Sequence, residues 1–407
     1  MRRVVVTGMG ALSPVGSDPG TLFANLMAGR SGIRRLTTSF IDQRDSQLAA
    51  TVEGFDPLVH FPKIKANSLD RATQFALVAS QQAVADAGLD LQHENRERIG
   101  VSLGTGMGGA TTIEESYLRL CRDPASRPKP FTLLMAMNNA AGSQIGLDFG
   151  LTGPCMTHCN ACASSAIAIG EAARLIRHGY ADAMLAGGTE ALLTYSTIRA
   201  WEVLRTLAIE DPEDPSASCK PFSADRTGLV LGEGAAMLVL EDYELARARG
   251  ARIHAEIIGY GGSNDSAHIT APSVEGQARA MQLALNDADI PAGEIDYINA
   301  HGTGTKLNDA IETAAIKRVC GTGIPVSSTK SMHGHLVGAS GAMEFVACLM
   351  ALREQSLPPT AHLKQPDPEC DLDYVPNIGR RDVNIRTIMS NSFAFGGSSG
   401  VLIARKI

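Results

Sequence analysis

The chain has 407 residues, of which 44% are hydrophobic and 19% are charged, and its formal net charge is −7. This composition is ordinary for a globular protein, and the length predicts two core-forming units. The negative charge gives no electrostatic case for nucleic-acid binding, and no apolar run reaches the roughly 20 residues that span a bilayer. The first residues enter a strand at once and leave no room for a secretory signal, so we expect a cytoplasmic protein that binds neither nucleic acid nor a membrane.

An internal repeat organises the chain. Residues 72–109 and 278–304 each read as a helix, a polar connector and an apolar strand that runs into a Gly-Thr-Gly turn. Residues 165–188 and 344–397 each hold an apolar helix, followed later by a short strand that ends on Gly-Gly. Such a long period is typical of a duplication and not of a solenoid. Strands that alternate with helices favour mixed sheets covered by helices.

The repeat predicts two similar α/β halves, residues 1–250 and 251–407, of which the first carries long insertions. In such pseudo-symmetric pairs, a functional site commonly lies where loops of both halves meet. Residues 110–131 and 209–227 are rich in Pro, Arg, Asp and Ser, and we expect both segments to be surface loops.

Three of the eight scattered cysteines, Cys155, Cys159 and Cys162, precede an apolar helix. Free thiols are expected in a chain of this size and type. The C-x3-C-x2-C spacing is that of an iron–sulfur ligand set, which would imply a radical enzyme. Alternatively, Cys162 is a nucleophile: the positive end of the helix dipole lowers a thiol pKa, and unpaired N–H groups supply half of an oxyanion site. A small core residue is the third interpretation.

Two histidines lie in glycine-rich loops farther along the chain. His301 follows a short apolar strand in the run Asn299-Ala-His-Gly-Thr-Gly-Thr305, and His335 stands at the entry to a helix of small residues. A polar ring in such a loop fills no core position, so each histidine indicates a site. Together with a cysteine at a helix N-terminus, the two histidines form a recognisable catalytic constellation.

Several signatures occur in one order along almost the whole chain: Val5-Val-Thr-Gly-Met-Gly, Ala161-Cys-Ala-Ser, Ala186-Gly-Gly-Thr-Glu190, Asn299-Ala-His-Gly-Thr, Val326-Ser-Ser-Thr-Lys-Ser and Asn391-Ser-Phe-Ala-Phe-Gly-Gly397. With them the chain resembles the β-ketoacyl-acyl-carrier-protein synthases of the condensing-enzyme family, in particular synthase II of bacterial fatty acid synthesis. The resemblance implies an α/β, thiolase-like fold with a duplicated five-layer αβαβα arrangement. It also implies an acyltransferase that condenses an acyl thioester with malonyl-acyl-carrier-protein with loss of CO2.

The resemblance assigns the catalytic roles. Cys162 would take the acyl chain from the pantetheine arm of a carrier protein as a thioester. His301 and His335 would bind the malonyl thioester carbonyl and stabilise the enolate formed on decarboxylation. The backbone N–H groups of Cys162 and Phe395 would form the oxyanion hole, and Phe395 would also be the gate between the acyl pocket and the malonyl site. Neither a metal nor a cofactor is implied beyond the phosphopantetheine of the carrier protein.

Further residues match supporting positions of the family. Lys330 and Glu344 match an ion pair that would orient and tune His335, and an ordinary structural salt bridge is the alternative. Substrate contacts fall on Thr270, Thr303, Thr305, Met107, Trp201 and Phe393. A carrier protein would dock on a local basic patch, for which the chain offers Arg127, Lys129 and Arg205.

The chain departs from the housekeeping pattern around the acyl tunnel. Ala394 stands where glycine is typical of the gate, which would stiffen the loop, and Trp201 lies in a segment that replaces a Gly-Gly-Phe-Gly type run. These changes leave open a specialised ketosynthase of a type II polyketide or aryl-polyene pathway. The expected assembly is therefore a homodimer, or a heterodimer with a homologous chain-length factor.

Three other classes fit the sequence less well. An iron–sulfur enzyme would need all three clustered cysteines to converge, whereas Cys155 and Cys159 lie in the stretch before the helix and are expected to be packing residues. A non-catalytic chain-length subunit would lack Cys162. A degradative thiolase would carry a second cysteine in the late Gly-Gly loop, where this chain has Phe395.

Overall fold

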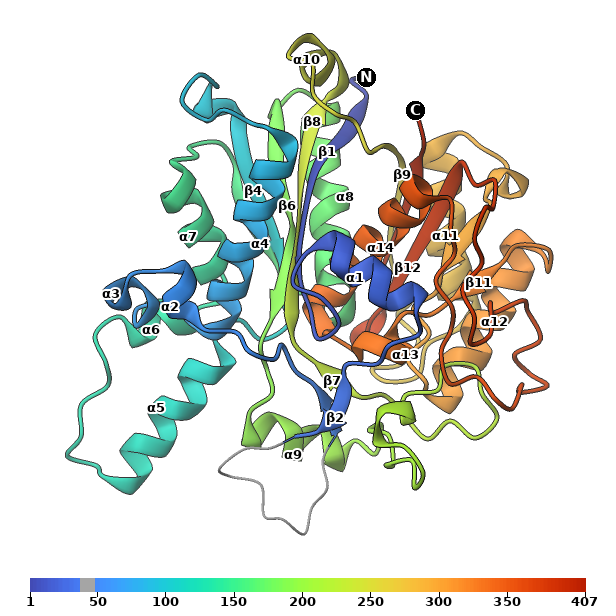
Figure 1. Cartoon of the computed structure of the whole chain (residues 1–407), viewed down its shortest axis with the longest axis horizontal. Coiled ribbons are helices and arrows are strands. Elements are labelled where there is room, and N and C mark those ends of the chain that lie inside the picture. The colour runs from blue at the N-terminus through green and yellow to red at the C-terminus, as the bar shows by residue number, and fades with distance from the viewer. Residues whose placement is uncertain (37–47) are drawn as a thin grey trace.

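The structure is a computed structural model that describes residues 1–36 and 48–407. Within these residues ten strands form one large sheet in the order β11-β10-β12-β13-β9-β1-β8-β6-β4-β5 (Figure 1). The strands from the first half of the chain are β1 (Val4–Leu12), β4 (Ile99–Gly104), β5 (Cys155–His158), β6 (Ala183–Glu190) and β8 (Gly234–Asp242). Those from the second half are β9 (Ala255–Asn264), β10 (Tyr297–Asn299), β11 (Val326–Ser327), β12 (Thr387–Phe393) and β13 (Ser398–Arg405).

The two halves of the sheet have the same topology. Strand β4 pairs in parallel with β5 and β6, and β8 then runs antiparallel to both β6 and β1. In the second half, β10 pairs in parallel with β11 and β12, and β13 runs antiparallel to both β12 and β9. Strands β1 and β9 pair antiparallel and join the two halves. Each strand therefore has a counterpart, as the internal repeat predicts.

Helices complete the layers. The central helices α8 (Ser164–Arg177) and α14 (Ser340–Glu354) pack on each other, and each contacts strands of both halves. Helix α14 is buried from Ser340 to Leu352, which explains why its sequence is apolar or small on every side. The outer helices are α4 (Arg71–Ala87), α7 (Ala140–Phe149), α11 (Val274–Ala288) and α12 (Lys306–Cys320). This is the five-layer arrangement that the family resemblance implies; the division of the chain at residue 250 stays a prediction.

The remaining elements lie around these layers. Strands β2 (Ile33–Arg35), β3 (Leu48–Ala50) and β7 (Leu231–Gly232) form a small second sheet. The other helices are α1 (Pro19–Met27), α2 (Pro57–His60), α3 (Lys63–Ala66), α5 (Ala110–Arg122), α6 (Thr132–Ala136), α9 (Tyr195–Val203), α10 (Tyr243–Ala248) and α13 (Lys330–His333). Across the described residues, no helix combines the length and the apolar character needed to cross a membrane.

Of the two predicted surface loops, the prediction for residues 110–131 is wrong in part. Residues 209–227 are mostly irregular, with one short 3-10 turn at Pro215–Ala217. Within residues 110–131, however, Ala110–Arg122 forms helix α5. The prolines that suggested a loop all follow Arg122, and the helix itself contains neither proline nor glycine. The loop prediction therefore failed for the first half of the segment, because it was based on the composition of the whole segment.

Close helix–strand packing repeats in the two halves. A Cβ atom on Gly10 of β1 would lie 1.9 Å from the backbone oxygen of Ala79 in α4. A Cβ atom on Gly261 of β9 would lie 2.1 Å from the backbone oxygen of Ala280 in α11. Contacts this short leave no room for a side chain, so both strands need glycine where the helix crosses them.

Gly10→Ala should therefore destabilise the protein by about 1–3 kcal/mol, because the added methyl group forces β1 and α4 apart. The matched control is Gly293→Ala, since no atom lies within 4 Å of the Cβ position there. Urea unfolding of the two variants and the wild type gives the comparison. Equal midpoints for Gly10→Ala and the control would contradict the packing argument.

Candidate active site

Cys162 lies in a short 3-10 turn, η2 (Ala161–Ala163), directly before α8. Ala161 has a φ of +46°, a left-handed conformation that turns the chain sharply into the helix. The Cys162 side chain is only 4% exposed, and its sulfur lines a cavity of about 300 Å³. His301 and His335 line the same cavity. The structure therefore brings together the three residues that the sequence singles out.

His335 is held between the nucleophile and the start of α14. Its Nε2 atom is 3.0 Å from Cys162 Sγ, and its Nδ1 atom is 2.8 Å from Ser340 Oγ. The His335 backbone N–H also donates to Val230 O at 2.6 Å. Both ring nitrogens thus have a partner, which fixes the ring with one nitrogen aimed at the sulfur. Ser340 is a site residue that sequence reasoning missed; its place five residues after His335, at the start of a helix, was the available signal.

Lys330 forms its hydrogen bonds with the other histidine, so the expectation that it orients His335 is wrong. The expected tuning of His335 stays a prediction, and besides burial the charge of Lys330 does lower the His335 pKa. The Lys330 Nζ atom donates to His301 O at 2.6 Å and lies 3.3 Å from His301 Nδ1. A lysine ammonium only donates, so His301 Nδ1 accepts and Nε2 carries the ring proton. The ammonium also forms a fully buried ion pair with Glu344. The pair therefore sets the tautomer of His301, while Ser340 supports His335.

Burial sets the protonation states of the site. It lowers the pKa of His301 and of His335 well below the usual range of histidine, and the nearby Lys330 ammonium acts in the same direction. Both rings are consequently neutral. Burial also raises the pKa of the Cys162 thiol to about 12, although Lys330 and the backbone N–H of Phe395 partly oppose it. The expected dipole-stabilised thiolate is thus wrong for the resting state, because desolvation of the sulfur outweighs the helix terminus.

Two backbone N–H groups act on the sulfur. Those of Cys162 and Phe395 both lower the pKa of the Cys162 thiol. Phe395 begins a short turn, η6 (Phe395–Gly397), in which Gly396 and Gly397 have φ values of +80° and +84°. These left-handed glycines bring the chain back toward the cavity. A pair of converging N–H groups beside a nucleophile is the geometry of an oxyanion hole.

Carboxylates behind the site fix the loop that carries His301. Glu312 accepts from the backbone N–H of His301 and of Gly302, each at 2.8 Å. Asp309 accepts from Gly304 N–H at 3.3 Å and from Phe222 N–H at 2.9 Å. Burial raises the pKa of Glu312 to about 7 and that of Asp309 to about 6. Sequence reasoning missed both residues, although their i, i+3 spacing on one helix was visible.

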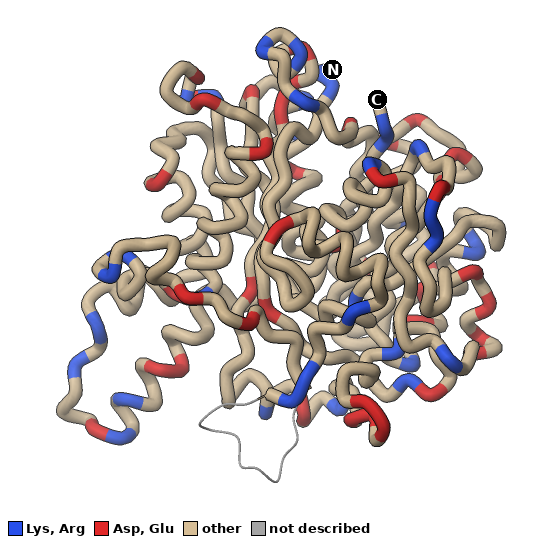
Figure 2. The backbone as a smooth tube through the Cα atoms, viewed as in Figure 1, with Lys and Arg blue, Asp and Glu red and all other residues tan. Residues whose placement is uncertain are grey.

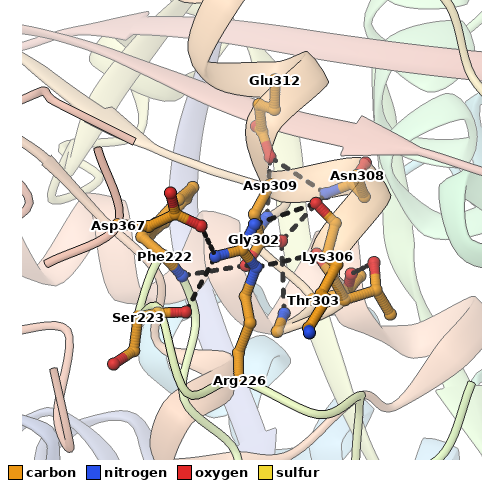
Figure 3. Close-up of polar contacts among 12 residues, drawn as sticks. Phe222, Ser223, Arg226, Gly302, Thr303, Lys306, Asn308, Asp309, Glu312 and Asp367 are labelled. Atoms are coloured by element: carbon orange, nitrogen blue, oxygen red, sulfur yellow. Dashed lines mark hydrogen bonds and ion pairs between the residues drawn. The ribbon is translucent and has the colours of Figure 1, made fainter. Parts of the chain in front are cut away.

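A buried arginine completes this support. Arg226 donates to Thr305 O at 3.2 Å and to Lys306 O at 2.9 Å, and it pairs with Asp309 and Asp367 (Figure 3). Its side chain and that of Asp309 are 2% and 0% exposed, so this pair is removed from water, whereas Asp367 is partly exposed. Because breaking a buried pair leaves an uncompensated charge, the loop is held strongly from behind.

Glu190 ties two loops around the cysteine. Its carboxylate accepts from the backbone N–H of Gly106, Met107 and Gly338, at 2.6, 3.1 and 2.9 Å. Gly338 lies in the turn η5 (Val337–Ala339), just after His335. Burial raises the pKa of Glu190 to about 7. The sequence motif contained Glu190, but its role as a bridge between the end of β4 and the start of α14 was not foreseen.

Most of the expected substrate residues lie around the cavity. Its lining includes Thr270, Thr303, Thr305, Trp201, Phe393 and Phe395. The hydroxyl oxygens of Thr303 and Thr305 are 2.9 Å apart, so they present one polar patch. Met107 is not brought to this lining: it lies between β4 and α5 and is 42% exposed. The roles of these residues stay predictions.

The three basic residues expected to dock a carrier protein are all exposed. Arg127 and Lys129 lie on the connection between α5 and α6, and Lys129 is 3.7 Å from Glu115. Figure 2 shows charges of both signs along this projecting segment. Arg205 lies elsewhere, between Leu204 and Thr206, which both line the cavity. Of these three residues, Arg205 is therefore the nearest in sequence to the cavity lining.

The cysteine run does not form a cluster site. Cys155 starts the edge strand β5 and Cys159 follows it; both are exposed in the single chain, so the expectation that they are packing residues is wrong within one chain. Only Cys162 reaches the cavity.

The ligand atoms of Cys162, His301 and His335 lie within 4.8 Å of one another, a spacing that a soft metal ion could use. The Lys330 ammonium next to His301 opposes a cation there.

The raised thiol pKa makes a prediction about reactivity. The rate of Cys162 alkylation by iodoacetamide should rise about tenfold per pH unit between about pH 7 and about pH 9, because only the thiolate reacts. No plateau should appear in this range, since the thiol pKa is about 12. The three cysteines share one tryptic peptide, because no Lys or Arg lies between them, so fragment-ion mass spectrometry is used to separate Cys162 from the exposed Cys155 and Cys159. A plateau below about pH 8 would instead show a thiolate stabilised by the helix terminus.

Known proteins share this chain's sequence and architecture. The chain matches the family descriptions "Beta-ketoacyl synthase, N-terminal domain" over residues 1–246 and "Beta-ketoacyl synthase, C-terminal domain" over residues 254–364. It is 43% identical over 410 residues to the 3-oxoacyl-[acyl-carrier-protein] synthase 2 of Staphylococcus aureus (strain COL), covering 100% of this chain and 98% of that relative.

Solved structures agree with this match. A beta-ketoacyl synthase from Burkholderia phymatum STM815 has a TM-score of 0.93 and 38% identity to this chain, with 100% of each chain covered. The ishigamide ketosynthase/chain length factor has a TM-score of 0.92 and 36% identity, covering 100% of this chain and 99% of that one. With its thiolase-like fold, the chain therefore belongs to the β-ketoacyl synthase family.

Proposed function

We propose that this protein is a β-ketoacyl-acyl-carrier-protein synthase that elongates an acyl chain by decarboxylative Claisen condensation. One observation carries the proposal: Cys162 Sγ lies 3.0 Å from His335 Nε2, in a cavity that it shares with His301. The 43% identity to a 3-oxoacyl-acyl-carrier-protein synthase over the full chain supports the same reaction. The substrates arrive on the phosphopantetheine of an acyl carrier protein, and no other cofactor takes part.

The first half-reaction transfers the acyl chain. Cys162 Sγ attacks the carbonyl carbon of the acyl thioester while its proton passes to His335 Nε2. The N–H groups of Cys162 and Phe395 stabilise the tetrahedral oxyanion. The carbon–sulfur bond to the carrier then breaks, and the pantetheine sulfur leaves as a thiol after taking the proton. Thr270, Thr303 and Thr305 line the cavity where the pantetheine would bind.

The second half-reaction forms the carbon–carbon bond. Before the second substrate binds, the His335 proton moves from Nδ1 to Nε2, and the Ser340 hydroxyl, which can both accept and donate, then donates to Nδ1. Malonyl-acyl-carrier-protein places its thioester oxygen on the Nε2–H groups of His301 and His335. Loss of CO2 leaves the electron pair in an enolate, which two neutral N–H donors stabilise without adding fixed charge. The enolate carbon attacks the acyl carbonyl, the carbon–sulfur bond to Cys162 breaks, and the departing thiolate takes a proton from water. The ion pair of Lys330 and Glu344 keeps His301 Nε2 protonated for this step.

A ketosynthase of a type II polyketide or aryl-polyene pathway is the second candidate. Trp201 puts a large ring into the lining of the cavity, where it would restrict the acyl chains that fit. The similarity to the ishigamide ketosynthase/chain length factor is consistent with this candidate. A panel of acyl carriers of different length and unsaturation separates the two candidates.

Carrier docking and cellular location follow as parts of the same proposal. Arg205, between two cavity-lining residues, is the first docking contact that we propose for an acidic carrier protein, with Arg127 and Lys129 as further contacts. We propose a cytoplasmic location, because the substrates of such a synthase are carried on a diffusible protein.

We also propose that the protein pairs through the edge of its sheet. Strand β5 ends the sheet and leaves one row of backbone groups unpaired within the described residues. Exposed apolar side chains lie on the neighbouring helices α6 and α7: Leu133, Leu134 and Leu147. The partner is a second copy of this chain, or a homologous chain-length factor in the polyketide alternative.

Light scattering of the purified protein should give twice the mass of one chain at micromolar concentration. A single-chain mass for the protein alone, with a two-chain mass only after co-expression with a cysteine-less homologue, would favour the heterodimer. A single-chain mass under both conditions would contradict pairing.

The reaction itself is tested by mass spectrometry of the intact protein after incubation with acyl carrier proteins. The protein should gain the mass of the acyl group, and Cys162→Ala should gain none because the nucleophile is lost. His301→Ala should still gain the acyl mass but fail to release CO2 from malonyl-carrier protein. Acyl mass retained in Cys162→Ala would refute the assignment of the nucleophile.

A further inference from the structure

Helix α9 and the turn after it form one wall of the cavity that contains Cys162. Trp201 lies in the last turn of α9, and Leu204 and Thr206 follow the end of the helix; all three line the cavity. Ile198, on the inner face of the helix, is buried in the apolar cluster that includes Cys162. The position of α9 therefore sets the shape of the cavity next to the reacting sulfur.

The start of α9 has no cap of its own. Its N-cap residue, Thr194, makes no side-chain capping hydrogen bond, and the first turn contains no acidic residue. The first N–H groups of any helix lack intrahelical partners, and a helix of 9 residues is marginal without tertiary contacts. The start of α9 therefore has to be held by another part of the fold.

Glu114 of α5 supplies the missing cap. One carboxylate oxygen accepts from the Tyr195 N–H at 2.8 Å, and the other accepts from the Ser196 N–H at 2.7 Å and from the Ser196 hydroxyl. Burial would raise the pKa of Glu114, but the hydrogen bonds from Ser196 and Tyr195 outweigh it and hold the pKa below its usual value. The carboxylate is therefore charged, and a negative charge at a helix N-terminus is stabilising.

Helix α5 is a firm base for this contact. Asp70 accepts from the Thr112 N–H at 2.9 Å and from the Thr112 hydroxyl at 2.6 Å, and it also caps α4. Thr111 Oγ1 donates to Ala191 O at 3.1 Å, in the connection that leads from β6 to α9. Glu114 lies within one turn of these anchors, so its carboxylate has a fixed place relative to the sheet.

The other end of the wall is held next to the sulfur. The Leu229 N–H donates to Thr206 O at 2.9 Å, and the Ala208 N–H donates to Leu229 O at 2.7 Å. Leu229 is buried, lines the cavity and belongs to the apolar cluster around Cys162. Leu229 thus holds the exit of α9 and Glu114 holds its entry, so loss of the Glu114 contact would let one end of the wall shift.

We propose that Glu114 is a positioning residue, whose carboxylate caps α9 and thereby sets the cavity wall that receives the acyl thioester. Glu114 is not among the residues that line the cavity, so it acts through α9. The inference rests on the proposed function for the identity of the substrate, whereas the cap does not depend on it. Loss of the cap should displace the wall and leave Cys162 and the two histidines in place, because other elements hold them.

Trp201 is the one tryptophan of the chain, so its fluorescence reports on the end of α9. Glu114→Gln removes the charge and replaces one acceptor oxygen with an NH2 group, which should change the Trp201 emission and its quenching by acrylamide. Glu115→Gln is the matched control, because Glu115 is the next residue of α5, is exposed and faces Lys129 instead of α9. It should leave both signals as in the wild type. Unchanged signals in Glu114→Gln would overturn the positioning role.

The same variants separate the wall from the nucleophile. With a small acyl thioester, which needs no carrier docking, Glu114→Gln should lower kcat/KM for acyl transfer to Cys162 about three- to tenfold, the scale of one or two hydrogen bonds. The rate of Cys162 alkylation by iodoacetamide should stay near the wild-type value, since this small reagent does not need the wall. An equal fall in both rates would show a general loss of structure and contradict the proposal.

A carboxylate on α9 itself should restore the wall. In the double variant Glu114→Gln/Ser196→Asp, the negative charge returns to the first turn of α9, and the amide introduced on α5 can donate to it. The double variant should recover most of the emission and of the rate. Ser196→Asp alone brings two carboxylates together and should lower the rate. A double variant that unfolds at the wild-type urea midpoint but recovers neither signal would refute the cap.

Emission and rate together distinguish a failure of the cap from a failure of the proposed function. If the wild type transfers no acyl group while Glu114→Gln still changes the Trp201 emission, the proposed acyl transfer fails and the cap stands. If Glu114→Gln slows acyl transfer without any change in emission, the loss does not act through α9. That result would overturn the positioning role and leave the proposed function intact.

Discussion

The contact between Cys162 Sγ and His335 Nε2, 3.0 Å long, is the constraint on which the rest of the structure depends. It joins the starts of the two central helices, α8 and α14, which occupy equivalent places in the two halves. A contact of this length survives only if both helices are held rigidly, and α14 is buried along nearly its whole length. The glycine-mediated packing of β1 on α4 and of β9 on α11 gives each half the compactness that this positioning requires. The five layers therefore serve to hold two helix ends together.

Electrostatics inside these layers favours neutral groups. The same burial that raises the pKa of the Cys162 thiol lowers the pKa of both histidines, so thiol and imidazoles rest uncharged. The Lys330 ammonium is the charge nearest the rings, and Glu344 neutralises it. Neutral imidazoles can donate to a developing enolate, whereas a resting thiolate–imidazolium pair would leave His335 charged before substrate arrives. The burial of the site, rather than the helix dipole, thus determines the protonation states of its thiol and imidazoles.

The sequence was sufficient where a residue's role follows from its local surroundings. Cys162, His301 and His335 stand out because glycine-rich loops and a helix start have no structural need for them. The partner of Lys330 could not be foreseen from the sequence. Lys330 and His335 are only five positions apart, but the intervening turn of α13 directs the ammonium to His301. The exposure of Cys155 likewise depends on β5 being the last strand of the sheet, which is a property of topology. The internal repeat predicted two similar α/β halves, whereas α5 has no counterpart in the repeat and was missed.

The duplication also explains why one nucleophile serves two halves. The turns before α8 and α14 share a left-handed residue, Ala161 with φ +46° and Val337 with φ +43°. The residue after it is Cys162 in the first half and Gly338 in the second. A Cβ atom on Gly338 would lie 2.3 Å from Gly106 N, and the Gly338 N–H is already bound to Glu190. The second turn therefore has no space for a nucleophile, and its half contributes histidines instead. Asymmetry at this one position converts two similar folds into a single site with one sulfur and two imidazoles.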